Sequence, residues 1–171
     1  MSQLQEVFKM NDAIETLIEL AEQGDVTAAI CLAHAYDTGL GLDGPQDRQK
    51  ACFWFQKGAE LGNADCQLNV GMMCEKGETV PQDYRQAAVW YRKAAEQGGK
   101  EAQRHLGYLY KNGFGVEQDY RQAYAWFSLA ATKGDHAAIV SRDKMVKKLA
   151  PAALIEAQKL AFGYFELYRR C

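Results

Sequence analysis

The sequence contains no apolar run close to the roughly 18 residues that a membrane-spanning helix needs. Its opening stretch, MSQLQEVFKMNDAIETL, also lacks the basic segment followed by an apolar run that marks a secretory signal. Positive charge is not in excess, because 20 Lys and Arg residues face 22 Asp and Glu residues and leave a net charge of −2. We therefore expect a soluble, cytoplasmic protein that neither inserts into a membrane nor binds nucleic acid.

The motifs of common enzymes and metal sites are missing as well. There is no G-x-S-x-G, no phosphate-binding loop and no H-E-x-x-H. The histidines His34, His105 and His136 have no cysteine or histidine at ligand spacing, so no metal site is predicted. The stretch from Gly39 to Gly44 fits G-x-G-x-x-G, but a helix rather than a strand should precede it, which argues against a dinucleotide site. The sequence thus predicts neither catalytic residues nor a cofactor.

What the sequence does contain is a tandem repeat. Trp54, Trp90 and Trp126 follow one another at intervals of 36 residues. Three further kinds of residue keep this register: Asp47, Asp83 and Asp119; Ala51, Ala87 and Ala123; Gly62, Gly98 and Gly134. We predict one all-α domain over residues 1–171, made of a half repeat (1–24), three repeats (25–62, 63–98, 99–134) and a C-terminal cap (135–171).

Each repeat is expected to form two helices, A and B, joined by a loop. In the second and third repeats helix B starts with an aspartate followed three residues later by a glutamine, at Asp83 and Gln86 and at Asp119 and Gln122, which resembles a capping box. Small residues, such as Gly71 and Gly107 in helix A, would let the two helices approach closely. The tryptophans would then fill the space between one repeat and the next.

After residue 134 the repeat pattern degrades. Asp135 can still begin a helix as its N-cap, and Pro151 suits the first turn of a last helix. A stack of repeats needs atypical ends to cover its terminal apolar face, so these two helices are the expected cap.

The five cysteines fit this scheme without disulfides. An odd number without a repeated spacing is not a disulfide framework. Cys66 takes the slot of Ala102, and Cys74 takes the slot of Tyr110. We expect both to be buried as apolar fillers, and Cys171 to be exposed at the end of the chain.

The repeat motif itself reads A-x-x-x-L-G-x-x-Y-x-x-G-x-G-V-x-x-D-Y-x-x-A-x-x-W-F/Y-x-x-A-A-x-x-G. In the third repeat its positions are Ala102, Leu106, Gly107, Tyr110, Gly113, Gly115, Val116, Asp119, Tyr120, Ala123, Trp126, Phe127, Ala130, Ala131 and Gly134. This motif resembles the Sel1-like repeat, a relative of the tetratricopeptide repeat. The resemblance implies a right-handed α/α superhelix, or solenoid, with a concave face and a role as a bacterial adaptor that holds other proteins. It supplies no catalytic residues.

In repeats of this kind helix A lines the concave side, so residues opposite its core stripe are the candidates for partner binding. They form a ladder of three positions in three repeats: Ile30, His34 and Asp37; Leu68, Met72 and Glu75; Arg104, Tyr108 and Lys111. The centre of the ladder is apolar and aromatic, which is unusual for a solvated helix face. Either a partner peptide covers it, or helix curvature and the caps bury it.

The leading hypothesis is therefore an adaptor that binds a protein or peptide, without a cofactor. An immunity-type protein that neutralises a toxin is one alternative. A hydrolase like the cysteine-rich, β-lactam-binding branch of the family is a weaker one, because that branch carries paired cysteines. Self-association through Phe162, Phe165 and Tyr168 is a third, and we expect a monomer or a weak homo-oligomer.

Overall fold

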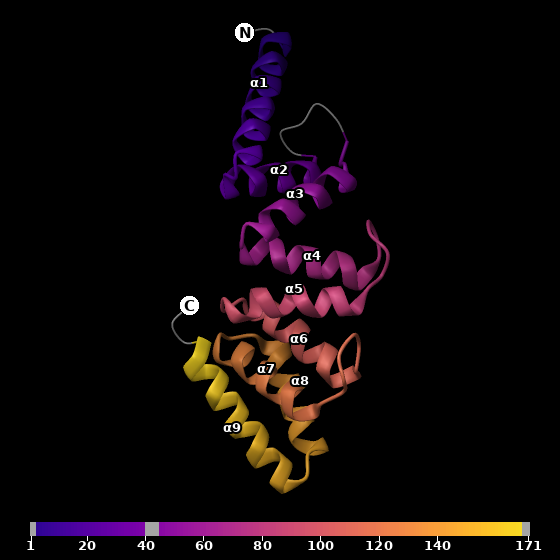
Figure 1. Cartoon of the computed structure of the whole chain (residues 1–171), viewed down its shortest axis with the longest axis vertical. Coiled ribbons are helices and arrows are strands. Elements are labelled where there is room, and N and C mark those ends of the chain that lie inside the picture. The colour runs from indigo at the N-terminus through magenta and orange to yellow at the C-terminus, as the bar shows by residue number, and fades with distance from the viewer. Residues whose placement is uncertain (1–2, 40–44, 169–171) are drawn as a thin grey trace. The chain divides into compact units, whose positions relative to one another are not determined.

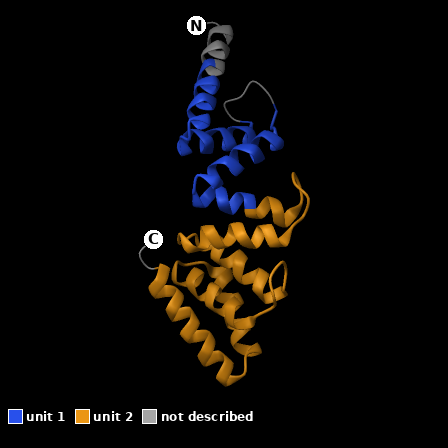
Figure 2. Cartoon of the chain, in the orientation of Figure 1, with its two compact units in different colours: residues 1–70 blue, residues 71–171 orange. Residues whose placement is uncertain are grey.

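The structure is a computed structural model that describes residues 3–39 and 45–168, with side chains from residue 12 onward. Within these ranges every regular element is a helix and no strand is present. This confirms the all-α prediction. The chain divides into two compact units, Met1–Val70 and Gly71–Cys171 (Figure 2), and the fourth helix contributes to both.

The first unit contains the N-terminal helices. They are α1 (Gln3–Glu22), α2 (Val26–Thr38), α3 (Arg48–Glu60) and the first half of α4 (Ala64–Lys76). α1 fills the predicted half repeat. α2 begins where Asp25 accepts a hydrogen bond from the Ala28 amide at 2.9 Å, as an N-cap should. Residues 40–44, which hold most of the G-x-G-x-x-G match, lie outside the described residues, but a helix does precede them.

The second unit holds the rest of α4 and five further helices. These are α5 (Tyr84–Glu96), α6 (Lys100–Asn112), α7 (Tyr120–Thr132), α8 (His136–Lys148) and α9 (Pro151–Tyr168) (Figure 1). α6 ends at Gly113, whose φ of 73° is the left-handed conformation that terminates a helix. Asp135 caps α8 and Pro151 opens α9, both as predicted.

The B helices α5 and α7 begin in the same way. The carboxylate of Asp119 accepts hydrogen bonds from the amides of Arg121 (2.8 Å) and Gln122 (3.3 Å), so the N-cap prediction is confirmed. The second half of the capping box is wrong. The Asp119 amide donates to the carbonyl of Tyr110 on the preceding helix, and Gln122 accepts instead from the hydroxyl of Tyr164. A donor already satisfied by its neighbouring helix needs no glutamine.

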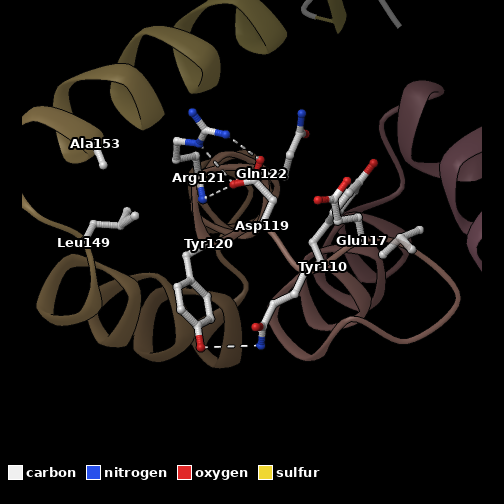
Figure 3. A pocket seen from close by; sticks show the side chains of 10 residues that line it. Tyr110, Glu117, Asp119, Tyr120, Arg121, Gln122, Leu149 and Ala153 are labelled. Atoms are coloured by element: carbon white, nitrogen blue, oxygen red, sulfur yellow. Dashed lines mark hydrogen bonds and ion pairs between the residues drawn. The ribbon is translucent and has the colours of Figure 1, made fainter.

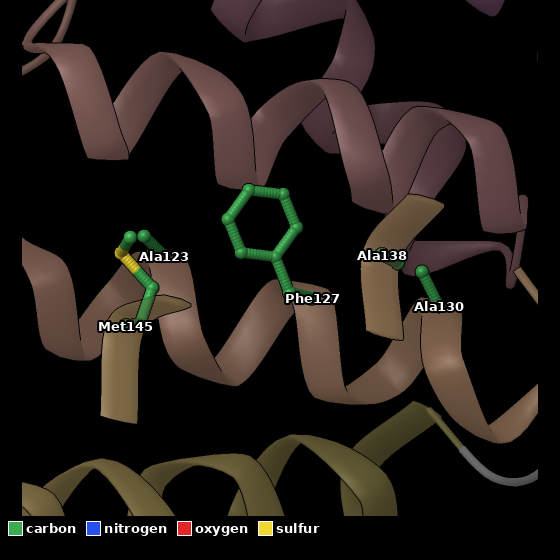
Figure 4. Close-up of a cluster of buried hydrophobic side chains, with 5 residues drawn as sticks. All are labelled: Ala123, Phe127, Ala130, Ala138 and Met145. Carbon is green, nitrogen blue, oxygen red and sulfur yellow. The ribbon is translucent and has the colours of Figure 1, made fainter. Parts of the chain in front are cut away.

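The close approach of helices A and B depends on glycine. A Cβ atom added at Gly107 of α6 would lie 2.8 Å from the Phe127 ring of α7. One added at Gly71 of α4 would lie 2.6 Å from the ring of Tyr91 on α5. The residue that fills each contact is the aromatic after the tryptophan, and Figure 4 shows Phe127 pointing from α7 toward α6.

The tryptophans are buried, as predicted for Trp54, Trp90 and Trp126. Trp126 is covered by α9, where the rings of Tyr164 and Tyr168 lie 4.7 and 5.8 Å away. α7 also packs against α8, through a small apolar cluster made of Ala123, Phe127, Ala130, Ala138 and Met145 (Figure 4). α8 and α9 therefore both pack on α7, and their role as the C-terminal cap stays a prediction.

Cysteines Cys66 and Cys74 are both buried, which confirms their prediction as fillers. Burial, with a smaller effect of the nearby Asp65 carboxylate, raises the pKa of Cys66 to about 11. This thiol therefore stays protonated and inert at neutral pH. Cys171 lies outside the described residues.

Candidate protein-binding face

None of the nine ladder residues is buried, and they divide between the two units. Those of the first unit are Ile30, His34, Asp37 and Leu68; those of the second are Met72, Glu75, Arg104, Tyr108 and Lys111. His34, Asp37 and Tyr108 are exposed, and the other six are half-buried. Their joint role in binding a partner stays a prediction.

In the first unit, the ladder rests on the core of the first repeat. The His34 ring meets the buried Phe55 of α3 edge to face, with centroids 5.3 Å apart. Ile30, one turn earlier on α2, is half-buried. This part of the ladder thus combines the half-buried Ile30 and Leu68 with the exposed His34 and Asp37.

In the second unit, an aromatic patch surrounds Tyr108. We define it as Tyr84 at the start of α5, Tyr108 on α6 and Phe114 in the loop after α6. The Phe114 ring lies 4.9 Å from that of Tyr84 and 6.0 Å from that of Tyr108. Tyr108 is 40% exposed and Phe114 37% exposed, so the patch is open to a ligand.

A lysine borders this aromatic patch. The Nζ atom of Lys111 lies 5.3 Å from the centroid of the Tyr108 ring, within the range of a cation–π interaction. Sequence reasoning found Tyr108 and Lys111 but missed Tyr84 and Phe114. The signal for Phe114 was present, because a large aromatic residue stands between two glycines of a loop.

Glu75 is held inside its own unit rather than presented freely. Its Oε2 atom accepts a 2.5 Å hydrogen bond from the Tyr91 hydroxyl and lies 3.2 Å from Nδ1 of His105. The Tyr91 and His105 rings also stack, with centroids 4.9 Å apart. This network joins α4, α5 and α6.

The network shifts the acidity of two of its members. The hydrogen bond with His105 lowers the pKa of Glu75; burial opposes the shift, and the Tyr91 hydroxyl reinforces it. Burial, followed by the bond to Glu75, raises the pKa of Tyr91 far above its usual value. Glu75 is therefore a carboxylate and Tyr91 a neutral donor throughout the neutral range.

Arg104 also has an internal partner. Its Nε atom donates to Oδ2 of Asp135 at 3.0 Å, and the other oxygen of Asp135 caps α8 through the Ala138 amide. The carboxylate thus joins α6 to the first turn of α8. A partner protein that used Arg104 would compete with this ion pair.

A pocket of about 720 Å³ lies elsewhere in the second unit, over the first turn of α7 (Figure 3). Its walls are the end of the preceding loop, the segment Asp119–Gln122, and the residues Leu149 and Ala153 of the cap. Arg121 pairs at its rim with Asp119 (3.1 Å) and with Glu156 (3.0 Å).

Arg121 and Asp119 at this rim hold each other in their charged forms. Burial works against ionisation of Asp119, but hydrogen bonds from the Arg121 side chain and from the amides of Arg121 and Gln122 outweigh it and lower its pKa. The same bond to Asp119, followed by that to Glu156, raises the pKa of Arg121. Arg121 and Asp119 at this rim are therefore already paired, whereas the exposed Glu117 also lines the pocket.

Two absences hold over the described part of the chain. The side chains described, those of residues 12–39 and 45–168, include no group of three His, Cys, Asp or Glu that could hold a metal ion. No helix within those ranges has the length and apolarity to cross a membrane.

The predicted self-association surface on α9 is split. Phe162 is 67% exposed and Phe165 is exposed as well. Tyr168 instead packs on Trp126 and lies 3.4 Å from Glu96 through its hydroxyl. Tyr168 thus belongs to the cap, and self-association through the two phenylalanines stays a prediction.

Comparison with known families agrees with the repeat register. The model of the Sel1 repeat matches residues 28–63, 64–99 and 100–135. No curated protein matches the chain. Among solved structures, a protective antigen present in uropathogenic Escherichia coli strains and displaying an SLR fold is 41% identical, with a TM-score of 0.79. That alignment covers 92% of this chain and 33% of the antigen, so the chain spans about a third of the antigen's length.

Two further solved structures are similar over most of their own length. A Sel1 repeat protein from Oxalobacter formigenes is 32% identical with a TM-score of 0.70, covering 77% of this chain and 98% of that one. Cysteine rich protein B of Helicobacter pylori is 25% identical with a TM-score of 0.57, covering 77% and 92%. These neighbours confirm the predicted α-solenoid class. Since the Sel1 repeat model also matches more than half of the residues, the chain belongs to the Sel1 repeat family.

Proposed function

We propose that this protein is an adaptor that holds a segment of a partner protein against its A helices, with the aromatic patch of the second unit as the anchor. Sel1 repeat proteins generally mediate protein–protein interactions. The observation that supports this site is the exposure of Tyr108 and Phe114 side by side, in contact and open to solvent. Tyrosine is among the residues that contribute most to protein interfaces, because it buries a large rigid area at small entropic cost.

Lys111 beside the patch, and Met72 as a further ladder residue, suggest the chemistry of the partner. Met72 on α4 is half-buried, and an adaptable thioether suits an apolar side chain of variable shape. Lys111 beside Tyr108 adds a positive charge at the edge. The partner segment would place an apolar or aromatic side chain on the patch and a carboxylate near Lys111.

The hydrolase alternative has no such support. It depends on the paired cysteines of the cysteine-rich branch, whereas none of the described cysteines, Cys31, Cys52, Cys66 and Cys74, forms a disulfide. A nitrocefin assay on the purified protein tests it directly.

The adaptor proposal is tested by capture of partners from the native lysate with the wild-type chain and two variants. Tyr108→Ala removes the anchor, and Val89→Ala is the matched control, because Val89 is an exposed apolar residue of the same unit outside the patch. We expect the partner recovered with Tyr108→Ala to fall about tenfold, and recovery with Val89→Ala to stay at the wild-type level.

Thermal unfolding of the same samples separates binding from folding. Tyr108 is 40% exposed and lies outside the buried core, so its removal should leave the melting temperature within about 3 °C of the wild type. Equal recovery with Tyr108→Ala, or loss of the folded state, would show that the patch is not the binding surface. Met72→Glu, at a half-buried ladder position on α4, provides a second variant.

A further inference from the structure

The pocket lies over the first turn of α7, and the equivalent surface one repeat earlier, over the first turn of α5, is occupied by a loop of the chain. Tyr120 and Arg121, in the first turn of α7, stand 36 residues after Tyr84 and Arg85, in the first turn of α5. What lies on Tyr84 and Arg85 therefore indicates what the equivalent surface on α7 is shaped to receive.

On α5 the occupant is the loop that follows α6. A Cβ atom at Gly115 would lie 2.2 Å from the carbonyl carbon and oxygen of Tyr84 and 2.5 Å from the Arg85 amide nitrogen. Only a glycine, here with a φ of +67°, brings the loop backbone this close to the helix. The preceding residue, Phe114, lays its ring 4.9 Å from that of Tyr84. The occupant is thus a glycine–aromatic–glycine turn.

On α7 the equivalent loop is missing from the cap. Residues 113–119 connect α6 to α7, but only Leu149 and Ala150 connect α8 to α9. Leu149 and Ala153, which line the pocket, stand 36 residues after Gly113 and Glu117 of the loop that fills the earlier place. The pocket is the space that such a loop would take.

The chemistry of the pocket fits a turn better than an ion. The amides of Arg121 and Gln122 are already bonded to Asp119, so they are not available to bind an anion. The ring of Tyr120 is covered by the exposed side chain of Lys148, whose Nζ atom lies 4.8 Å from the ring centroid. A long exposed lysine can move aside at little cost.

We propose that this pocket is a docking site for a turn of a partner protein in which an aromatic residue stands between two glycines. The aromatic ring would replace Lys148 on Tyr120, and the second glycine would lie on the backbone of Tyr120 and Arg121. This site is independent of the aromatic patch, and neither proposal requires the other.

The probe is a cyclic peptide with the sequence of residues 112–117, Asn-Gly-Phe-Gly-Val-Glu, labelled for fluorescence polarisation and titrated with the full chain. Its matched control carries alanine in place of the second glycine. We expect the glycine peptide to bind at least about tenfold more tightly, since the added methyl group would overlap the α7 backbone as it would at Gly115.

Two variants of the protein place the binding in the pocket. Ala153→Trp fills it from α9, where Ala153 is half-buried, and should abolish binding; Val140→Trp adds the same ring at an exposed site on α8 and should not. Equal binding of both peptides, no binding of either up to about 1 mM, or full binding by a folded Ala153→Trp variant would each overturn the proposal. The peptide pair decides the outcome even if Ala153→Trp does not fold.

Discussion

The helices α5 and α7 start from nearly the same sequence and end in different surroundings. Both begin within the same sequence, DYRQA, at residues 83–87 and 119–123. Both are capped by their aspartate, and both press an aromatic ring onto a glycine of the A helix before them. Yet Val89 on α5 is 48% exposed, whereas Ala125, at the same position of α7, is fully buried.

This difference shows which residues determine which contacts. The residues that recur every 36 positions form the contacts between helices A and B of one repeat, so these contacts are the same in each repeat. The residues that do not recur determine what packs against the outside of each helix pair. On α7 the cover is α9, which brings Tyr164 and Tyr168 onto Trp126; on α5, Trp90 has Lys93 over its ring at 4.2 Å instead.

The strongest test of this contrast is to remove the tryptophans. Trp126→Ala should lower the free energy of unfolding by roughly 3–5 kcal/mol, the usual cost of deleting a buried aromatic, because α9 loses its main contact as well. Trp90→Ala should fall in the same range, at its lower end, since Trp90 keeps a small exposed edge. Urea unfolding followed by circular dichroism measures both.

A loss below about 1 kcal/mol for either variant would mean that the tryptophan is not part of the core. If Trp90→Ala cost more than Trp126→Ala, α9 would contribute less to the stability of α7 than its ring contacts indicate.

The second test addresses what the two helices share. Gly107→Ala places a methyl group 2.8 Å from the buried Phe127 ring, which should cost about 1–3 kcal/mol of overpacking against up to about 1 kcal/mol of improved helix propensity. We expect a net loss of about 1–2 kcal/mol in urea unfolding. Gly163→Ala is the matched control, because α9 leaves open space around Gly163 and the change should stabilise by about 0.5–1 kcal/mol.

If Gly107→Ala were neutral, α6 and α7 could separate slightly without cost, and glycine would not be required for their approach. A double-mutant cycle with Phe127→Leu tests the contact directly. The effect of Gly107→Ala on the free energy of unfolding should differ between the two backgrounds only if the added methyl group touches the Phe127 ring.

Most of the fold was predictable because several residue types in each repeat independently indicate the same helices. Caps, helix ends and the burial of Trp54, Trp90 and Trp126 all follow from residues that keep a common register. The capping-box detail failed because a sequence pattern does not show that the Asp119 amide already has a partner on the previous helix.

The candidate site was predictable only in part. Helical spacing correctly kept Tyr108 and Lys111 out of the core, but it could not show that Glu75 bonds to Tyr91 and His105. Those partners lie on two other helices, and their approach depends on the packing of three elements. Helical spacing places residues on a face but does not show what neighbouring helices bring to it.

The third test compares one position in two repeats, Glu75 and Lys111, of which only Glu75 is tied into a network. Glu75→Gln removes the charge that accepts from Tyr91 and should cost roughly 1 kcal/mol at pH 7. Because the pKa of Glu75 is lowered on folding, its stabilisation is present above about pH 4.5 and is lost as the pH falls through the folded value.

The stability difference between wild type and Glu75→Gln should therefore shrink between pH 7 and pH 3.5 when both are unfolded in urea. A difference that stays constant over this range would show that the ionised carboxylate does not stabilise the network. Lys111→Gln, the control at the equivalent position, should show no such acid dependence.

The smallest change in the free energy of unfolding is expected at Val89 of α5, the position that corresponds to Ala125 of α7. Val89→Ala removes a side chain that is half in water and replaces a β-branched residue with the best helix former, so the two effects nearly cancel and the free energy of unfolding should change by less than about 0.5 kcal/mol. Ala125→Val, the reverse change on α7, introduces two methyl groups at a fully buried position and should destabilise measurably by overpacking. Equal effects of the two changes in urea unfolding would mean that position 125 of α7 is as exposed in solution as position 89 of α5, because the same pair of residues responds differently only where the burial differs.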